Sequence, residues 1–162
     1  MRSVVLCCFM ITFLFSSCAL LPYPKMEVDN AWIREAKISS ISAGDLNQSC
    51  VCDIKTGSLT TNVYLTIHNN GGGDDRLLKV ESAIATRIEM RRSGLTDDLV
   101  TLEPVDSIEI PAGAQIAFAP GEYVLVVMGI REDLKPGDSV PFTLFFEKSG
   151  ALELQVEVHK KE

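Results

Sequence analysis

The chain has 162 residues, 46% of them hydrophobic, and its 22 acidic side chains outnumber 15 basic ones for a net charge of −7. This length predicts one domain with additional segments, and the apolar content is enough to build a hydrophobic core. An acidic chain is unsuited to nucleic acid, because phosphates must be neutralised by Lys and Arg. It is compatible with collecting a cation.

Residues 1–17 have the pattern of a bacterial lipoprotein signal peptide. Arg2 supplies the positive start, and residues 4–15 are almost wholly apolar but too short to span a bilayer comfortably. Ser16, Ser17 and Cys18 then match the cleavage site at which a cysteine is lipidated and becomes the mature N-terminus. A plain signal peptide and an uncleaved anchor remain the alternatives. The pattern favours export, with lipidation at Cys18 holding the protein on a membrane that faces the periplasm or the cell exterior.

Residues 18–27 contain two prolines and read as a tether between the lipid and a domain at residues 28–158. The first expected strand covers residues 28–36 and contains the only tryptophan, Trp32, which we expect in the core or at its rim. The last residues, 159–162, are expected to form a frayed, solvated tail.

Residues 37–61 form the least regular part of the domain and contain Cys50 and Cys52. So long a connection in a compact domain is either functional or mobile. In an extended chain both thiols would share one face, and thiolates are soft ligands that suit Cu(I) or Zn. Two ligands alone are a weak metal signal. Partly buried thiols, disulfides to partners and a bond between the two cysteines are the alternatives, since paired thiols outside the cytoplasm are normally oxidised.

Residues 62–70 alternate strictly between apolar and polar side chains, which predicts a strand. A turn should follow at residues 69–75, where Asn and Gly tolerate positive φ. His68 stands beside this turn and has no second ligand nearby in the sequence, so a structural role is expected.

Further short apolar runs are separated by Pro and Gly turns, which brings the count to nine or ten short strands and predicts an all-β sandwich or barrel. They occupy residues 76–80, 84–92, 99–103, 106–110, 116–118, 123–128, 140–146 and 152–158. No long helical periodicity follows residue 18. Two scattered histidines give no sign of a catalytic triad, and no metalloprotease or Cys-x-x-Cys spacing is present. We therefore do not expect an enzyme.

Four segments carry a family resemblance: Y-L-T-I-H-N-N-G-G-G-D-D-R-L-L, S-I-E-I-P-A-G, Y-V-L-V-V-M-G-I-R-E-D-L-K-P-G-D and V-P-F-T-L-F-F-E-K-S-G. Together they resemble the periplasmic copper chaperone family of the PCu(A)C type over residues 28–158, with residues 37–61 as an apparent insertion. The resemblance implies a cupredoxin-like Greek-key β-sandwich. It also implies Cu(I) binding through His and Met, and delivery of Cu(I) toward the CuA centre of cytochrome oxidase.

The ligand motif of that family is a His, later a Met, and then a His-x-Met pair. Aligned on the flanking segments, these ligands fall on the following four positions: Arg91, Leu102, Val124 and Val126. None offers a donor to Cu(I), and the arginine would repel a cation, so we expect no metal there. Met90 and Met128 flank these positions, and strand alternation is expected to turn each methionine to the opposite face from its neighbour.

Two functional hypotheses follow. The first is a lipoprotein of the copper chaperone family that still handles copper or helps to assemble an oxidase, with an altered or lost site. Any remaining Cu(I) would then be held by Cys50 and Cys52, the paired soft ligands left in the mature chain. The alternative is a module without metal that binds a partner protein through the face of Val124 and Val126.

Overall fold

The computed structural model describes residues 22–37, 59–96 and 99–160. Within these ranges the fold consists of strands and connections, with no helix, which confirms the all-β prediction. Ten strands are present: β1 (Met26–Arg34), β2 (Thr60–Asn69), β3 (Asp75–Glu81), β4 (Arg87–Thr96), β5 (Leu99–Pro104), β6 (Ile108–Ile110), β7 (Gln115–Phe118), β8 (Tyr123–Met128), β9 (Ser139–Phe146) and β10 (Gly150–His159).

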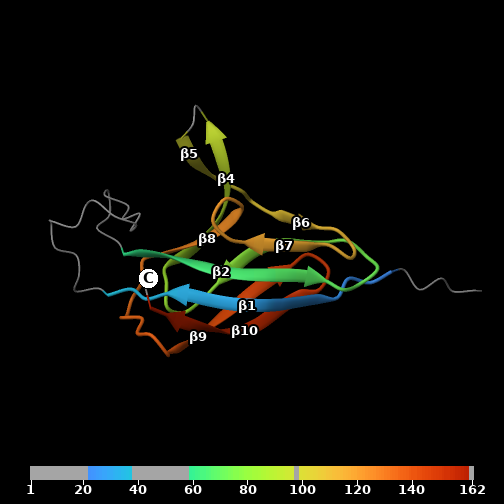
Figure 1. The fold of residues 1–162 in the computed structure, drawn as a ribbon. Helices are drawn as coiled ribbons and strands as arrows, with labels where there is room; N and C mark the ends of the chain where they lie inside the picture. Colours follow the sequence, from blue (N-terminus) through green and yellow to red (C-terminus); the bar gives the residue numbers. More distant parts are fainter. Residues whose placement is uncertain (1–21, 38–58, 97–98, 161–162) are drawn as a thin grey trace, which may run out of the picture.

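The ten strands form one curled sheet in the order β5-β4-β8-β7-β2-β1-β10-β9-β3-β6. Strand β2 pairs with β8 along its first half and with β7 along its second half. Strand β1 is antiparallel to β2 and parallel to β10. In Figure 1 the upper strands fold over the lower ones to make two layers, and the β4–β5 hairpin extends away from the body. The sandwich predicted from the sequence is confirmed.

Side-chain alternation explains which face of each strand is buried. In β2, Val63, Leu65 and Ile67 are buried, whereas the intervening side chains are half-buried. In β8 the five residues after Tyr123 are all buried, as expected for a strand covered on both faces. The main core lies between the layers, and its largest fully buried side chains come from strands far apart in sequence: Ile33, Ile67, Leu77, Phe118, Leu125, Phe142 and Leu144.

Several strands differ from their predicted limits, and in β1 and β4 the neighbouring elements show why. Strand β1 begins two residues early, since Met26 pairs with Asn69 at the end of β2. Strand β4 begins at Arg87 and not at residue 84, because Thr86 still belongs to a turn in which its N–H donates to the carbonyl groups of Met128 and Gly129.

Three turns come together at one end of the sandwich, at residues 69–75, 111–114 and 147–150, and we call this the glycine end. Asn69, which is 0% exposed, lies at its centre. The Nδ2 atom of Asn69 donates to the carbonyl oxygens of Gly73 (2.8 Å), Ile110 (3.1 Å) and Pro111 (3.2 Å). Its Oδ1 accepts from the backbone N–H groups of Lys25 and Gly71. One buried amide therefore fastens two turns and the N-terminal segment together.

Asp75 fastens the third turn. Its carboxylate accepts hydrogen bonds from the backbone N–H groups of Arg76 (2.7 Å), Lys148 (2.9 Å) and Ser149 (2.9 Å). Burial would raise the pKa of this carboxyl group, but the donors of Ser149, Lys148 and Arg76 outweigh burial and hold the pKa below its ordinary value of 3.8. The ionised form of Asp75 therefore stabilises the fold.

The glycines at residues 71–73 have a different role from the one that the sequence suggested. None of them has positive φ, whereas five other glycines in the described ranges do. A Cβ on Gly71 would collide with the backbone of Lys25 and Tyr23, and a Cβ on Gly73 would collide with the Pro22 carbonyl. The turn was predicted correctly, but its glycines permit the close approach of residues 22–25.

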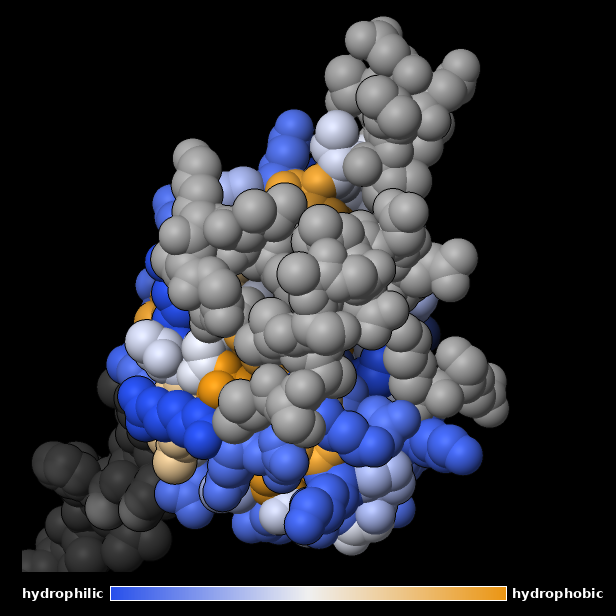
Figure 2. Space-filling model, turned by 90° about the vertical axis from the view of Figure 1, so that its left-hand side faces the viewer, coloured by the Kyte–Doolittle hydropathy of each residue, from blue (hydrophilic) through white to orange (hydrophobic). Residues whose placement is uncertain are grey.

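The other end of the sandwich, formed by the connections at residues 129–138 together with Ala36, Leu59 and His159, we call the opposite end. Leu134 and Ala36 exchange backbone hydrogen bonds there, and the Ile130 N–H donates to the Leu59 carbonyl. Figure 2 views the molecule from this side, and the coloured surface is largely hydrophilic with small hydrophobic areas between.

Candidate functional site

The four positions that the resemblance assigns to metal ligands lie on one face of β4, β5 and β8. Val124, Val126 and Met128 form a small buried cluster, 6%, 4% and 7% exposed, and Leu102 of β5 packs against it. This cluster is separate from the main core. The sequence alignment therefore selected residues that do come together, and three of the four are aliphatic.

The position of Met128 corrects the expectation that it faces away from its flanking valines. Side chains in a strand repeat every two residues, so Val124, Val126 and Met128 must share a face. Met90, in contrast, is 6% exposed within the main core, on the other side of β4 from Arg91. The alternation argument was right for Met90 and wrong for Met128.

An ion-paired row on β4 lies beside this cluster. Arg87 is opposite Met128, Glu89 is opposite Val126, and Arg91 is opposite Val124 in the β4–β8 register. Both nitrogens Nε and Nη2 of Arg91 bond Oε2 of Glu89, at 3.0 and 2.7 Å. Arg87 Nη2 contacts Oε1 of the same carboxylate at 3.0 Å. Two guanidinium groups share one carboxylate, which leaves a formal charge of +1 on the row.

The thioether of Met128 is also engaged, because Arg87 Nε donates to its sulfur at 3.2 Å. The positively charged guanidinium group of Arg87 therefore lies against the one sulfur atom of the buried cluster. Cu(I) prefers soft thioether, thiolate and imidazole donors, and it is repelled by neighbouring positive charge. Among the residues that the structure describes, no group of three or more His, Cys, Asp or Glu side chains is arranged to hold a metal ion.

The remaining predicted site residues, Cys18, Cys50 and Cys52, lie outside the described residues. The segment with Cys50 and Cys52 departs after Lys37 and rejoins before Leu59, next to the opposite end. His68 is near the glycine end, where its Nε2 atom is 3.4 Å from Oδ2 of Asp29. Thr60 is the first residue of β2 and follows the segment that contains Cys50 and Cys52. His68 is eight residues further along the strand, about 27 Å away at 3.4 Å for each residue. The structure thus pairs His68 with a carboxylate.

A stack of three rings was missed by the sequence analysis. The Trp32 ring lies 4.3 Å from that of Tyr64 and 5.3 Å from that of His159, measured between centroids. His159 is the last residue of β10 and not part of a tail. A cleft of about 610 Å³ adjoins the stack and is lined by Trp32, His159, Arg34 and Pro136, among others. Alternation puts each ring on the outer face of its strand, but only the register between strands shows that they meet.

No helix in the described ranges is both long and apolar enough to cross a membrane. Several solved structures share the fold, among them the following three. The apo PCuAC domain of PmoF1 has a TM-score of 0.61 and 20% identity, covering 85% of this chain and 95% of that domain. The copper-bound PCuAC domain of PmoF2 has a TM-score of 0.60 and 20% identity, covering 86% and 98%. The Cu(I) form of DR1885 from Deinococcus radiodurans has a TM-score of 0.55 and 18% identity, covering 90% and 84%.

The fold therefore defines a PCuAC-like domain, as the sequence resemblance indicated. The chain belongs to the family described as "Putative lipoprotein LpqE-like", which it matches over residues 26–158. It is also similar to "Putative lipoprotein Lxx21020" of Leifsonia xyli subsp. xyli, with 25% identity over 103 residues. That match covers 63% of this chain and 62% of the relative.

Proposed function

We propose that this protein is an exported, lipid-anchored accessory protein, not an enzyme, which does not bind copper at the ligand positions of PCuAC domains. The observation that carries the proposal is the row of Arg87, Glu89 and Arg91 beside a buried cluster of valines. A Cu(I) ion there would meet a guanidinium group at each end of the row and a thioether already bonded to one of them. Neither charge nor ligand chemistry favours the ion.

The lipid anchor is assigned to Cys18, and it is supported by the Ser16-Ser17-Cys18 triplet and by the description of the family. The protein would then act at a bacterial membrane, on the side facing the periplasm or the cell exterior. Cys18→Ala should abolish labelling by radioactive fatty acid and remove the protein from the membrane fraction or block its processing. Cys8→Ala, inside the predicted signal peptide, is the matched control and should change neither. Membrane-bound, lipid-labelled Cys18→Ala protein would contradict the anchor.

For the role itself, we favour copper handling or assembly of the CuA centre of an oxidase, with Cu(I) carried by Cys50 and Cys52. The support is chemical: two thiolates hold Cu(I) in near-linear geometry, so this ion needs no third ligand from the protein. Reduced protein should compete with a chelator for Cu(I), and Cys50→Ser with Cys52→Ser should lose this ability. Equal affinity in the parent and the double variant would remove the cysteines from the account.

The ligand positions can be tested separately in the variant that lacks both cysteines. Arg91→His, Leu102→Met, Val124→His and Val126→Met together should create Cu(I) binding. We expect a gain of at least about 100-fold, or about 2.7 kcal/mol, in the chelator competition. Alanine at the same four positions is the control and should bind no better than its parent. If the alanine variant instead loses affinity that its parent had, the original residues bind copper and the proposal is wrong.

The second candidate is a protein-interaction module that binds no metal. Val124 and Val126 are only 6% and 4% exposed, so a partner would meet the charged groups around them before the valines. Arg87, with a side chain 59% exposed, is the most accessible of these groups. Absence of Cu(I) binding in both the reduced parent and the cysteine variant would favour this candidate.

A further inference from the structure

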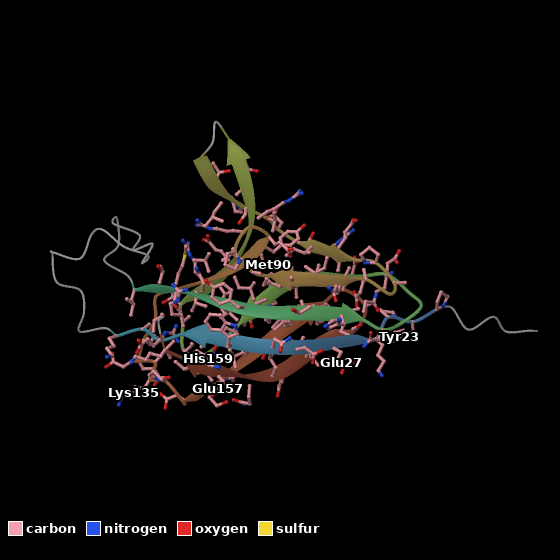
Figure 3. The ribbon with its side chains drawn as sticks, in the orientation of Figure 1. Tyr23, Glu27, Met90, Lys135, Glu157 and His159 are labelled. Atoms are coloured by element: carbon pink, nitrogen blue, oxygen red, sulfur yellow. The ribbon has the colours of Figure 1, made fainter. Side chains whose placement is uncertain are left out.

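The chain segment just before β1 is fastened to the glycine end of the sandwich. The Asn70 N–H donates to the Lys25 carbonyl at 2.8 Å, and the Gly72 N–H donates to the Tyr23 carbonyl at 3.2 Å. The Tyr23 hydroxyl donates to the Lys148 carbonyl at 3.0 Å, which ties the segment to the β9–β10 turn as well. Figure 3 shows Tyr23 at the end of the molecule away from His159 and Lys135.

This attachment involves close backbone contact as well as hydrogen bonds. Pro24 is buried, and the glycines at residues 71–73 leave room for residues 22–25 to lie directly on the turn. Residues 18–27 were expected to form a tether, but their described part, residues 22–27, lies on the domain. Only the four residue steps from Cys18 to Pro22 then separate the lipidated residue from the fastened segment.

The short connection limits how far the glycine end can be from a lipid on Cys18. Four residues span at most about 14 Å when fully extended. The sandwich is longer than this, since the ten residues of β2 extend about 30 Å from the opposite end to the glycine end. An upright domain with its opposite end on the bilayer would need a connection about twice as long as the one available.

We propose that the glycine end, formed by the turns at residues 69–75, 111–114 and 147–150, is the surface that faces the lipid bilayer. The inference rests on the proposed lipidation of Cys18. Exposed side chains of both signs lie at this end, with Lys25 and Lys148 near Asp74 and Glu147. The orientation therefore comes from the short tether and not from attraction to anionic headgroups, and zwitterionic lipid is sufficient.

The orientation directs the opposite end away from the membrane. This end includes the cleft beside Trp32 and His159. It also includes Lys37 and Leu59, between which the sequence contains Cys50 and Cys52. A partner that approaches from the aqueous side would reach this end of the domain first.

The test uses the full-length, lipidated protein in phosphatidylcholine vesicles that contain a nitroxide headgroup lipid as quencher. A fluorophore is attached at Ala112→Cys, in an exposed turn of the glycine end, or at Glu132→Cys, exposed at the opposite end. Both variants carry Cys50→Ser and Cys52→Ser, so that the introduced thiol is labelled. Quenching should be several-fold greater at position 112 than at position 132.

A lengthened tether provides the matched control. Insertion of about 12 Gly and Ser residues between Leu21 and Pro22 raises the mean reach of the connection to about 22 Å and leaves the fastened segment intact. The difference in quenching should then shrink to less than half. Equal or reversed quenching in protein that co-sediments with vesicles would overturn the orientation alone. Failure of the protein to co-sediment would overturn both the orientation and the lipid anchor.

Discussion

The glycine end and the face of β4, β5 and β8 satisfy their polar groups in opposite ways. At the glycine end, Asn69 and Asp75 are buried and bond almost entirely to backbone groups of other segments. On the face, Glu89, Arg87 and Arg91 are partly exposed and bond to one another. Backbone groups cannot be exchanged by mutation, whereas side chains that pair along one strand can.

This difference explains how a PCuAC-like fold can be retained with aliphatic and charged side chains at the positions to which the resemblance assigns metal ligands. A strand accepts any side chain that suits its exposure and its cross-strand neighbours. Arg91, Val124 and Val126 meet that requirement without altering the pairing of β4 with β8. Asn69 and Asp75 at the glycine end have no such freedom, because a change at either leaves buried donors or acceptors without partners. Substitutions at the two regions should therefore differ in cost.

The largest effect is expected for Asn69→Ala. The change removes three hydrogen bonds that the side chain donates to backbone carbonyls of the turns, and two that it accepts, one from the Gly71 N–H and one from the Lys25 N–H of the N-terminal segment. We expect the free energy of unfolding in urea to fall by about 3 kcal/mol, since several buried groups lose their partners together. The control is Asn70→Ala, which loses an exposed hydrogen bond to Glu27 and should cost less than about 1 kcal/mol. Equal costs would remove the distinction between buried and exposed polar groups at this end.

The next effect is expected for Asp75→Asn. An amide presents one acceptor oxygen in place of the two carboxylate oxygens that bond Arg76, Lys148 and Ser149. The loss should be about 2 kcal/mol at neutral pH, as for hydrogen bonds to a charged group. Asp74→Asn, at an exposed carboxylate that accepts one N–H from Ala112, should cost less than about 1 kcal/mol.

The pH dependence of the same variant sharpens this prediction. The pKa of Asp75 is lowered in the folded state, so its contribution is complete above the ordinary value of 3.8 and is lost as the pH falls through the folded-state pKa. The difference in unfolding free energy between the parent and Asp75→Asn should therefore narrow in acid. A difference that stays constant from neutral pH down to strongly acidic pH would show that ionisation of Asp75 is not the source of its effect.

The sequence predicted features that depend on local pattern better than features that depend on register. Alternation identified β2 and the two-sided burial of β8, because burial follows directly from side-chain direction in a strand. The stack of Trp32, Tyr64 and His159 escaped notice, since it requires knowing that β1 lies between β2 and β10. Residues 71–73 were assigned to a turn for the wrong reason, because the close approach of residues 22–25 leaves no trace in the local sequence.

The candidate site was predicted in part. Aligning the chain to the family motif selected Leu102, Val124 and Val126, which do meet. The same alignment gave no indication that Glu89 would neutralise Arg91 or that Arg87 would bond the sulfur of Met128. The contact between Arg87 and Met128 depends on the register of β4 against β8, which only the structure supplies. Glu89 and Arg91 lie two residues apart on β4, so alternation places them on one face, but only the structure shows that they bond.

The smallest effect is expected on the ion-paired row. Glu89→Gln removes the carboxylate shared by Arg87 and Arg91, whose side chains are 59% and 24% exposed. Ion pairs this accessible to water contribute little, so the free energy of unfolding should fall by about 1 kcal/mol or less, and by less still in high salt. Glu109→Gln, which breaks the more exposed pair with Arg76, is the matched control and should cost under about 0.5 kcal/mol. A salt-independent cost above about 2 kcal/mol for Glu89→Gln would mean that the row is a rigid buried network like that of Asn69. The contrast between a fixed glycine end and a substitutable face would then fail, because the face too would depend on one particular arrangement of charges.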